Sequence, residues 1–286
     1  MTLDEFIIAN EPDIRLGFFL GIFGVMALWE IFAPRRKLSV SKGVRWLNNF
    51  GIVVLNTVLL RLLFPAAAVG MAVFAQANGW GIFNYYETPP LLAIVASIVI
   101  LDMVIYLQHV MVHAVPVLWR LHRVHHADLD FDVTTGARFH PLEIILSMLI
   151  KFATIAVLGP PLVAVIVFEI LLNATAMFNH SNARLPLALD RVLRFIVVTP
   201  DMHRVHHSIE DDEINCNFGF NLPWWDRLFG TYRDQPRGGH EGMTIGIRSF
   251  RDLKDCGWLP GMLSIPFRGK IHDYVINRRQ WHEDEH

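Results

Sequence analysis

Two short stretches decide how this sequence is interpreted: WRLHRVHHADL at Trp119–Leu129 and DMHRVHHSIE at Asp201–Glu210. Both contain HRVHH, in which histidines follow one another at i, i+3 and i+4. On a helix, with about 100° per residue, these side chains fall within an arc of roughly 100°, so we expect each triplet to face one point. An HxxxH pair, His109 and His113, precedes the first triplet, and His180 precedes the second.

These histidines are candidate metal ligands. Neutral imidazole binds iron, zinc and copper well. Together they offer more nitrogens than one ion can accept, so the pattern predicts two metal ions close together. Surface histidines placed by chance do not explain two triplets and a pair in so hydrophobic a chain. The predicted metal ligands are His109, His113, His122, His125, His126, His180, His203, His206 and His207.

The composition indicates a membrane protein. Of 286 residues, 53% are hydrophobic and only 18% are charged, and the mean hydropathy is +0.36. Soluble domains have about 25% charged residues. The net charge of −2 shows no basic excess that would suggest nucleic-acid binding. The two cysteines, Cys216 and Cys256, are far apart, which excludes a disulfide framework and a zinc ribbon.

Apolar runs of membrane-spanning length make up much of the chain, since about 20 residues cross a bilayer core. We expect an all-α integral membrane protein with about four transmembrane helices or helical hairpin arms. A cytosolic, histidine-rich helical cap should follow from Leu185 onward. Whether the second run is one bent crossing or two pieces stays open. The runs are Leu16–Phe32, Leu47–Ala77, Leu91–Val110, and two arms from Pro141 to Phe178 broken at Gly159-Pro160-Pro161.

The distribution of charge predicts an orientation. Acidic residues precede the first run, and five basic residues between Arg35 and Arg45 follow it. Because basic segments stay cytoplasmic, the N-terminus should lie outside, and every histidine cluster on the cytoplasmic face. The expected location is a bacterial inner membrane or, in a eukaryote, the endoplasmic reticulum.

Two polar stripes run along predicted membrane helices. Asp102 lies on the helix of His109, and Glu169 and Asn173 lie on the helix that ends at His180. Ionisable groups within a membrane usually face the bundle interior. We expect both carboxylates to accept the second ring N–H of a ligand histidine. His140 is interpreted as a helix cap or an outer-shell group, and lone histidines such as His240, His272, His282 and His286 as surface or capping residues.

The histidine pattern resembles that of the fatty acid hydroxylase superfamily, which includes sterol desaturases and C-4 methyl sterol oxidases. The resemblance covers roughly Leu91–Tyr232. It extends beyond HxxxH, HxxHH and HxxHH to further landmarks. These are RFHPLE at Arg138–Glu143, NHSN at Asn179–Asn182, TPDMHRVHH at Thr199–His207 and NFGFNLPWWDRLFGTY at Asn217–Tyr232.

The resemblance implies a non-haem di-iron centre that uses O₂ to hydroxylate, or alternatively desaturate, an unactivated C–H bond of a lipid. The eight histidines of the three motifs would be catalytic metal ligands, with His180 as a ninth. Some lipid hydroxylases have another histidine where this chain has Ala176, so water or Asn173 would complete one metal. Zinc can replace iron in purified protein. Without an HPGG motif, the electron donor would be a separate protein, either cytochrome b5-like or a ferredoxin with its reductase.

The expected organisation has three parts: membrane anchor helices in 1–88, a catalytic domain in 89–235 and a cytosolic extension in 236–286. The substrate stays open among sterols, hopanoids, fatty acyl chains, carotenoids and aminolipids. A carotenoid hydroxylase-type enzyme is the alternative within the enzyme class. A non-catalytic metal-binding or transport protein is the alternative outside it. The aromatic side chains between Phe218 and Tyr232 are expected to pack the cap onto the membrane interface rather than line a substrate site.

Overall fold

The computed structural model describes residues 3–269, and over this range the protein is built from helices without strands. The extended backbone pairs at isolated bridges, Pro34 with Ala183 and Ser208 with Ile245. The predicted all-α architecture is confirmed. His272, His282, His286 and the rest of the chain after residue 269 lie outside the described residues.

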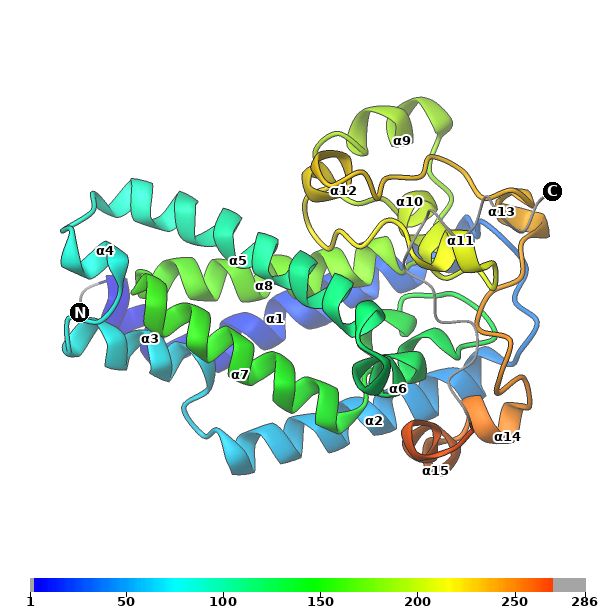
Figure 1. The fold of residues 1–286 in the computed structure, drawn as a ribbon, viewed down its shortest axis with the longest axis horizontal. Coiled ribbons are helices and arrows are strands. Elements are labelled where there is room, and N and C mark those ends of the chain that lie inside the picture. The colour runs from blue at the N-terminus through cyan, green and yellow to red at the C-terminus, as the bar shows by residue number, and fades with distance from the viewer. Residues whose placement is uncertain (1–2, 270–286) are drawn as a thin grey trace.

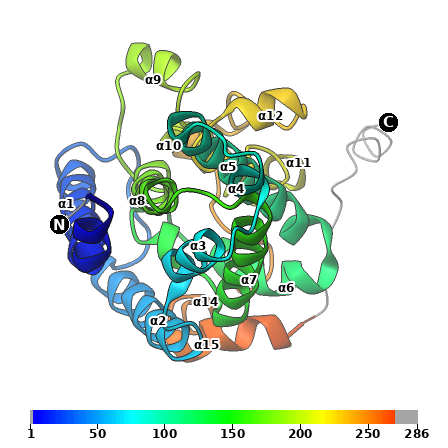
Figure 2. The same ribbon diagram turned by 90° about the vertical axis from the view of Figure 1, so that its left-hand side faces the viewer.

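Five helical segments of the described chain are long and apolar enough to cross a membrane, at 9–32, 42–85, 90–114, 141–158 and 162–179. They lie along the long axis of the molecule in Figure 1, and Figure 2 views them end-on. α1 packs against α8, and α3 packs against α7. The prediction of an integral membrane protein therefore holds. The helices are α1 (Leu3–Phe32), α2 (Lys42–Leu63), α3 (Ala67–Ala77), α5 (Pro90–Ala114), α7 (Pro141–Leu158) and α8 (Leu162–Asn179), with the short α4 (Ile82–Tyr85) between α3 and α5.

The second apolar run forms two helices, α2 and α3, separated at Phe64–Ala66. Pro65 explains the break, because it lacks the backbone N–H that a continuing helix needs. α3 lies closer than α2 to the N-terminal end of the bundle in Figure 1.

The predicted hairpin is present as α7 and α8, and Gly159 makes its turn possible. This glycine caps α7 in the left-handed region, at φ +62°. A Cβ there would lie 2.2 Å from the carbonyl oxygen of Trp80, so a side chain would collide with the neighbouring loop. The proline pair that follows prevents the helix from continuing.

Short helices and loops form the cap, at the end of the bundle opposite the N-terminus (Figure 1). Buried ion pairs connect it to the start of α2: Arg45 pairs with Asp128 and Asp132. Arg35, which follows α1, pairs with Asp201 at 3.1 Å. The cap elements are α6 (Pro116–His126), η1 (Thr135–Ala137), α9 (Leu187–Leu193), α10 (Pro200–His206), α11 (Asp211–Ile214), α12 (Trp224–Leu228), α13 (Gly239–Gly242), α14 (Leu253–Cys256), α15 (Leu259–Ser264) and η2 (Ile265–Phe267).

Candidate metal centre

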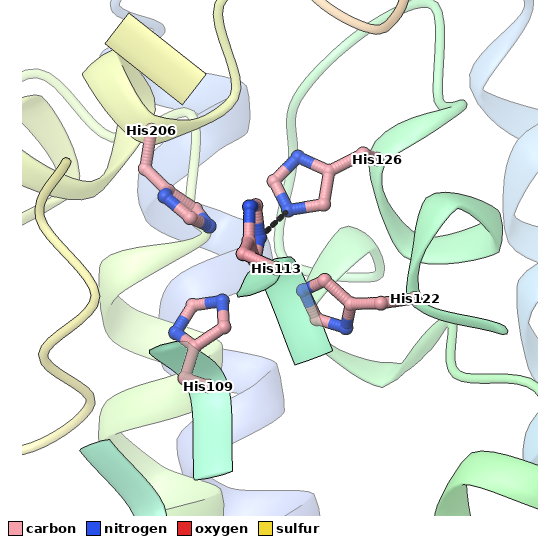
Figure 3. Close-up of side chains that lie close together, drawn as sticks. All are labelled: His109, His113, His122, His126 and His206. Carbon is pink, nitrogen blue, oxygen red and sulfur yellow. Dashed lines mark hydrogen bonds between the residues drawn. The ribbon is translucent and has the colours of Figure 1, made fainter. Parts of the chain in front are cut away.

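All nine predicted ligand histidines are buried, and they gather in two groups where the membrane helices meet the cap. In the first cluster, one nitrogen of each ring lies within 4.8 Å of those of all the others. Figure 3 shows its five rings around a common space. They come from α5, α6 and α10. The first cluster consists of His109, His113, His122, His126 and His206.

The second cluster consists of four histidines, whose nearest nitrogens also lie within 4.8 Å of one another: His125, His180, His203 and His207. Nε2 of His180 is 3.2 Å from Nε2 of His125 and 3.0 Å from Nε2 of His203. His180 lies directly after the C-terminus of α8, so a membrane helix contributes to this cluster as well.

The expectation that each triplet faces one point is wrong, because both HxxHH motifs divide between the clusters. His122 and His126 enter the first cluster, while His125 enters the second. In the other motif the assignment is reversed: His206 belongs to the first cluster, and His203 and His207 to the second. Residues four apart lie on one helix face, whereas adjacent residues are rotated by about 100°. Two short helices can therefore each serve two sites.

Burial favours the neutral form of clustered histidines on the cap side of the membrane helices. Burial, followed by neighbouring imidazoles, holds the pKa of His126 and of His207 well below the usual 6.5. Burial lowers the pKa of His180 to about 3. A neutral imidazole has a free lone pair, and in the first cluster Nε2 of His109, His122 and His206 is buried without a hydrogen-bond partner. Converging, buried imidazole nitrogens without hydrogen-bond partners fit a transition-metal ion.

Protein oxygens hold the second nitrogen of three rings in the first cluster, whereas Nδ1 of His126 has no hydrogen-bond partner. Nδ1 of His109 lies 2.8 Å from the Phe218 carbonyl oxygen, and Nδ1 of His206 lies 2.7 Å from that of Cys216. Nδ1 of His122 lies 2.6 Å from Oε1 of Glu143. Each Nδ1–H can donate to its oxygen, which leaves the lone pair on Nε2 facing the cluster.

Sequence reasoning missed Glu143 and the loop around Phe218 as parts of the site. Glu143 ends the RFHPLE landmark and lies in the first turn of α7, which is the signal that could have identified it. The backbone carbonyl groups of the loop around Phe218 have no comparable signal in the sequence. Phe218 and Phe220 were expected at the membrane interface, but both rings lie 5.4 Å from the ring of His109.

The expected roles of the two membrane carboxylates are corrected by the structure. Asp102 accepts hydrogen bonds from Trp225 Nε1 at 2.8 Å and from the backbone N of Leu222 at 3.2 Å. Glu169 pairs with Lys151 at 2.7 Å and with Arg15 at 3.0 Å. Both carboxylates lie too far along their helices to reach a ligand ring.

The other two outer-shell candidates also have local partners. Asn173 donates from Nδ2 to the Glu169 carbonyl oxygen one turn earlier, at 2.8 Å. His140 caps α7, because its Nδ1 accepts a hydrogen bond from the backbone N of Leu142 at 3.2 Å. Neither side chain belongs to a cluster. His240, expected at the surface, is buried and lies 3.5 Å from Asp201.

A cavity of about 300 Å³ opens beside the first cluster, between the membrane helices. His109 and His122 line it, together with side chains of α1, α2, α5, α7 and α8. None of the four histidines of the second cluster lines this cavity. The first cluster therefore borders this cavity directly.

Comparison with known proteins supports this assignment to a family. The model for "Fatty acid hydroxylase" matches residues 94–231. Ornithine lipid hydroxylase OlsE of Rhizobium tropici is 27% identical over 283 residues, which cover 95% of this chain and 82% of that protein. Human alkylglycerol monooxygenase is 31% identical, over 52% of this chain and 32% of its own. Human cholesterol 25-hydroxylase is 25% identical, over 52% of this chain and 55% of its own. No solved structure matches.

The matched region contains both clusters, from His109 to His207. The relatives are named hydroxylases and monooxygenases. The chain spans most of the rhizobial relative, but only about a third of the human monooxygenase. Residues 94–231 are therefore a fatty acid hydroxylase domain, and its similarity to named hydroxylases and monooxygenases supports an oxygen-dependent oxidoreductase.

Proposed function

We propose that this protein hydroxylates a C–H bond of a membrane lipid with O₂, using one iron ion in each histidine cluster. One observation carries the proposal. His109 and His122 have partnerless Nε2 atoms in the first cluster, and the same two side chains line the cavity between the membrane helices. A lipid that enters from the bilayer would thus place its carbons beside the metal-binding nitrogens.

In this proposal the nine clustered histidines are the metal ligands. Iron, when bound, supplies the activation of O₂ that no amino-acid side chain can provide for an alkyl C–H bond. The protein holds and orients the imidazoles, and Glu143 fixes the ring of His122 through its Nδ1. Phe220 contributes an apolar ring to the cavity wall, 5.4 Å from the ring of His109. Zinc can occupy the same imidazoles in purified protein.

The proposed arrangement in the membrane follows the charges. The basic segment after α1 contacts the cap through Arg35 and Arg36, and by the positive-inside rule these contacts support a cytoplasmic cap and an N-terminus outside. A separate cytochrome b5-like protein, or a ferredoxin with its reductase, would deliver electrons there. We assign catalysis to 89–235, membrane anchoring to 1–88 and a cytosolic extension to 236–286. Arg15 and Asn56 line the cavity, so the anchor also shapes the substrate site.

Comparative lipidomics of cells with and without the gene tests this function. We expect lipids that gain one oxygen; a loss of two hydrogens would indicate desaturation instead. The panel should include ornithine lipids, because the rhizobial relative is named for them, as well as sterols, hopanoids and acyl lipids. His125→Ala should abolish the change while the protein still inserts. His140→Asn, outside both clusters and still able to cap α7, is the control. Full oxygenation by His125→Ala would contradict the proposal.

A further inference from the structure

The wall of the membrane cavity is more polar than a site for a plain hydrocarbon chain requires. Polar groups within a membrane are costly, so they usually mark function. Apolar side chains such as Leu60 and Met148 form part of the wall. Several uncharged polar side chains interrupt it: Asn56, Thr57, Gln108, Ser147 and Asn173.

At the histidine end of the cavity, buried acceptors lack donors. Asn56 is 7% exposed, and its Nδ2 donates to the Phe139 carbonyl oxygen at 2.9 Å. This bond fixes the amide, so the partnerless atom is the acceptor Oδ1. Glu143 uses Oε1 for His122, and its Oε2 has no partner. Oε1 of Gln108, the residue before His109, has none either.

The other end of the cavity is different because its charges are already paired. Lys151 lies eight residues after Glu143 on α7, which corresponds to about 12 Å along the helix axis. It pairs with Glu169, which also pairs with Arg15. Arg15 pairs in turn with Glu11 at 2.7 Å. These charges balance one another and require nothing from a ligand. The atoms without partners are hydrogen-bond acceptors, and they lie at the histidine end of the cavity.

We infer that the cavity binds the hydrogen-bond-donating part of a polar lipid, a hydroxyl or amino group, at Asn56, Gln108 and Glu143. The adjacent carbons of the lipid would then lie beside His109 and His122. A volume of about 300 Å³ is at the small end of ligand pockets, so only this part of the lipid enters. This inference rests on the proposed function and narrows its substrate class from lipids in general to lipids with donors near the reacting carbon.

Binding of simple amphiphiles to the purified full chain in nanodiscs tests the inference without turnover. The probes are 1-dodecanol, dodecylamine and methyl undecyl ether, which match in length but differ in donors. We expect the alcohol, the amine or both to raise the midpoint of thermal unfolding more than the ether does. A larger effect of the amine would assign the site to amino groups, and a larger effect of the alcohol to hydroxyls. Equal shifts with all three probes would overturn the inference, since water would then satisfy the acceptors.

Asn56→Leu, which keeps the branched shape of the side chain but removes both the acceptor Oδ1 and the donor to the Phe139 carbonyl oxygen, should abolish the difference between donor probes and ether. Thr57→Val is the matched control, because the Thr57 hydroxyl already donates to the Val53 carbonyl oxygen. The wild-type comparison decides the question even if Asn56→Leu does not fold. Failure of the proposed function is seen separately: iron-loaded protein would then turn over no lipid although it still prefers donor probes. Turnover without any preference would overturn this inference alone.

Discussion

The two histidine clusters use the same helices, α6 and α10, but hold their rings differently. In the first cluster, protein oxygens accept from Nδ1 of most rings, including His109, His122 and His206. In the second, the Ala176 carbonyl oxygen accepts from Nδ1 of His180, whereas Nδ1 of His125 and both nitrogens of His207 have no hydrogen-bond partner. We therefore expect the first cluster to hold its rings in place without metal, and the second to depend more on a bound metal.

The clusters also differ in their access to substrate. His109 and His122 connect the first cluster to the membrane cavity, while none of the four histidines of the second cluster lines it. The cluster whose rings are held by protein oxygens is thus also the cluster that borders the membrane cavity. Nine similar histidines therefore need not have similar roles. Five predictions test the comparison, beginning with the largest expected effect.

Both clusters contain buried histidines with a lowered pKa, so acid should destabilise the metal-free protein through both. Burial keeps the pKa of His126 and of His203 well below 6.5, so the unfolded chain binds protons that the folded chain does not. The metal-free protein should therefore lose stability as the pH falls below about 6.5, by about 1.4 kcal/mol per such histidine at pH 5.5. The losses add over both clusters. Thermal unfolding between pH 7.5 and 5.5 measures them, and an unchanged midpoint would contradict buried neutral rings.

Removing one ligand from each cluster tests whether both bind metal. We expect His206→Ala and His203→Ala each to lose one of two iron ions, and each to lower lipid oxygenation by more than ~100-fold, beyond the usual effect of an outer-shell change. Metal analysis of purified protein and product mass spectrometry measure the two effects. If His203→Ala kept both ions, the second cluster would not be a metal site.

Replacing Glu143 tests the preorganisation of the first cluster. Glu143→Ala removes the acceptor for Nδ1 of His122, so metal affinity or activity should fall about 10–100-fold. Glu143→Gln is the control, because its amide oxygen can still accept that N–H and should retain more of both. Equal losses in the two variants would mean that the charge, rather than the hydrogen bond, matters.

A chelator should separate the clusters by rate. Metal should leave the second cluster several-fold faster than the first, because outer-shell hydrogen bonds strengthen metal binding at the first. A coloured chelator would record two phases in the loaded protein. His203→Ala should lack the fast phase, and His206→Ala the slow one. A single phase in the wild type would remove the distinction drawn between the clusters.

Asp102 should have the smallest effect on the metals. Asp102→Ala leaves the donors of Trp225 and Leu222 without their acceptor, which should cost about 1–3 kcal/mol of stability. Iron content should not change. A lower midpoint of thermal unfolding with unchanged iron content would fit this structural role. Loss of iron would instead indicate that Asp102 supports the metal ligands.

Much of the fold could be predicted because its signals are local. The apolar runs predicted α1, α5 and the α7–α8 hairpin, and Gly159-Pro160-Pro161 marked the turn between its arms. The break at Pro65 was visible as a proline, but not its outcome as two helices. The roles of Asp102 and Glu169 were misjudged, since residues on the same helix face as a histidine can still lie several turns away. Their hydrogen-bond and ion-pair partners come from distant segments, and the periodicity of a single helix cannot predict such partners.

The amino-acid sequence alone was enough to predict which groups could bind metal and which segments could cross a membrane. Both depend on residue type and on spacing along a single helix. Only the tertiary structure decided how each HxxHH divides between two clusters and that Glu143 holds His122. It also decided that a cavity reaches the first cluster. The physical reason is that these features depend on how α5, α6, α8 and α10 are placed relative to one another, and long-range packing sets that placement.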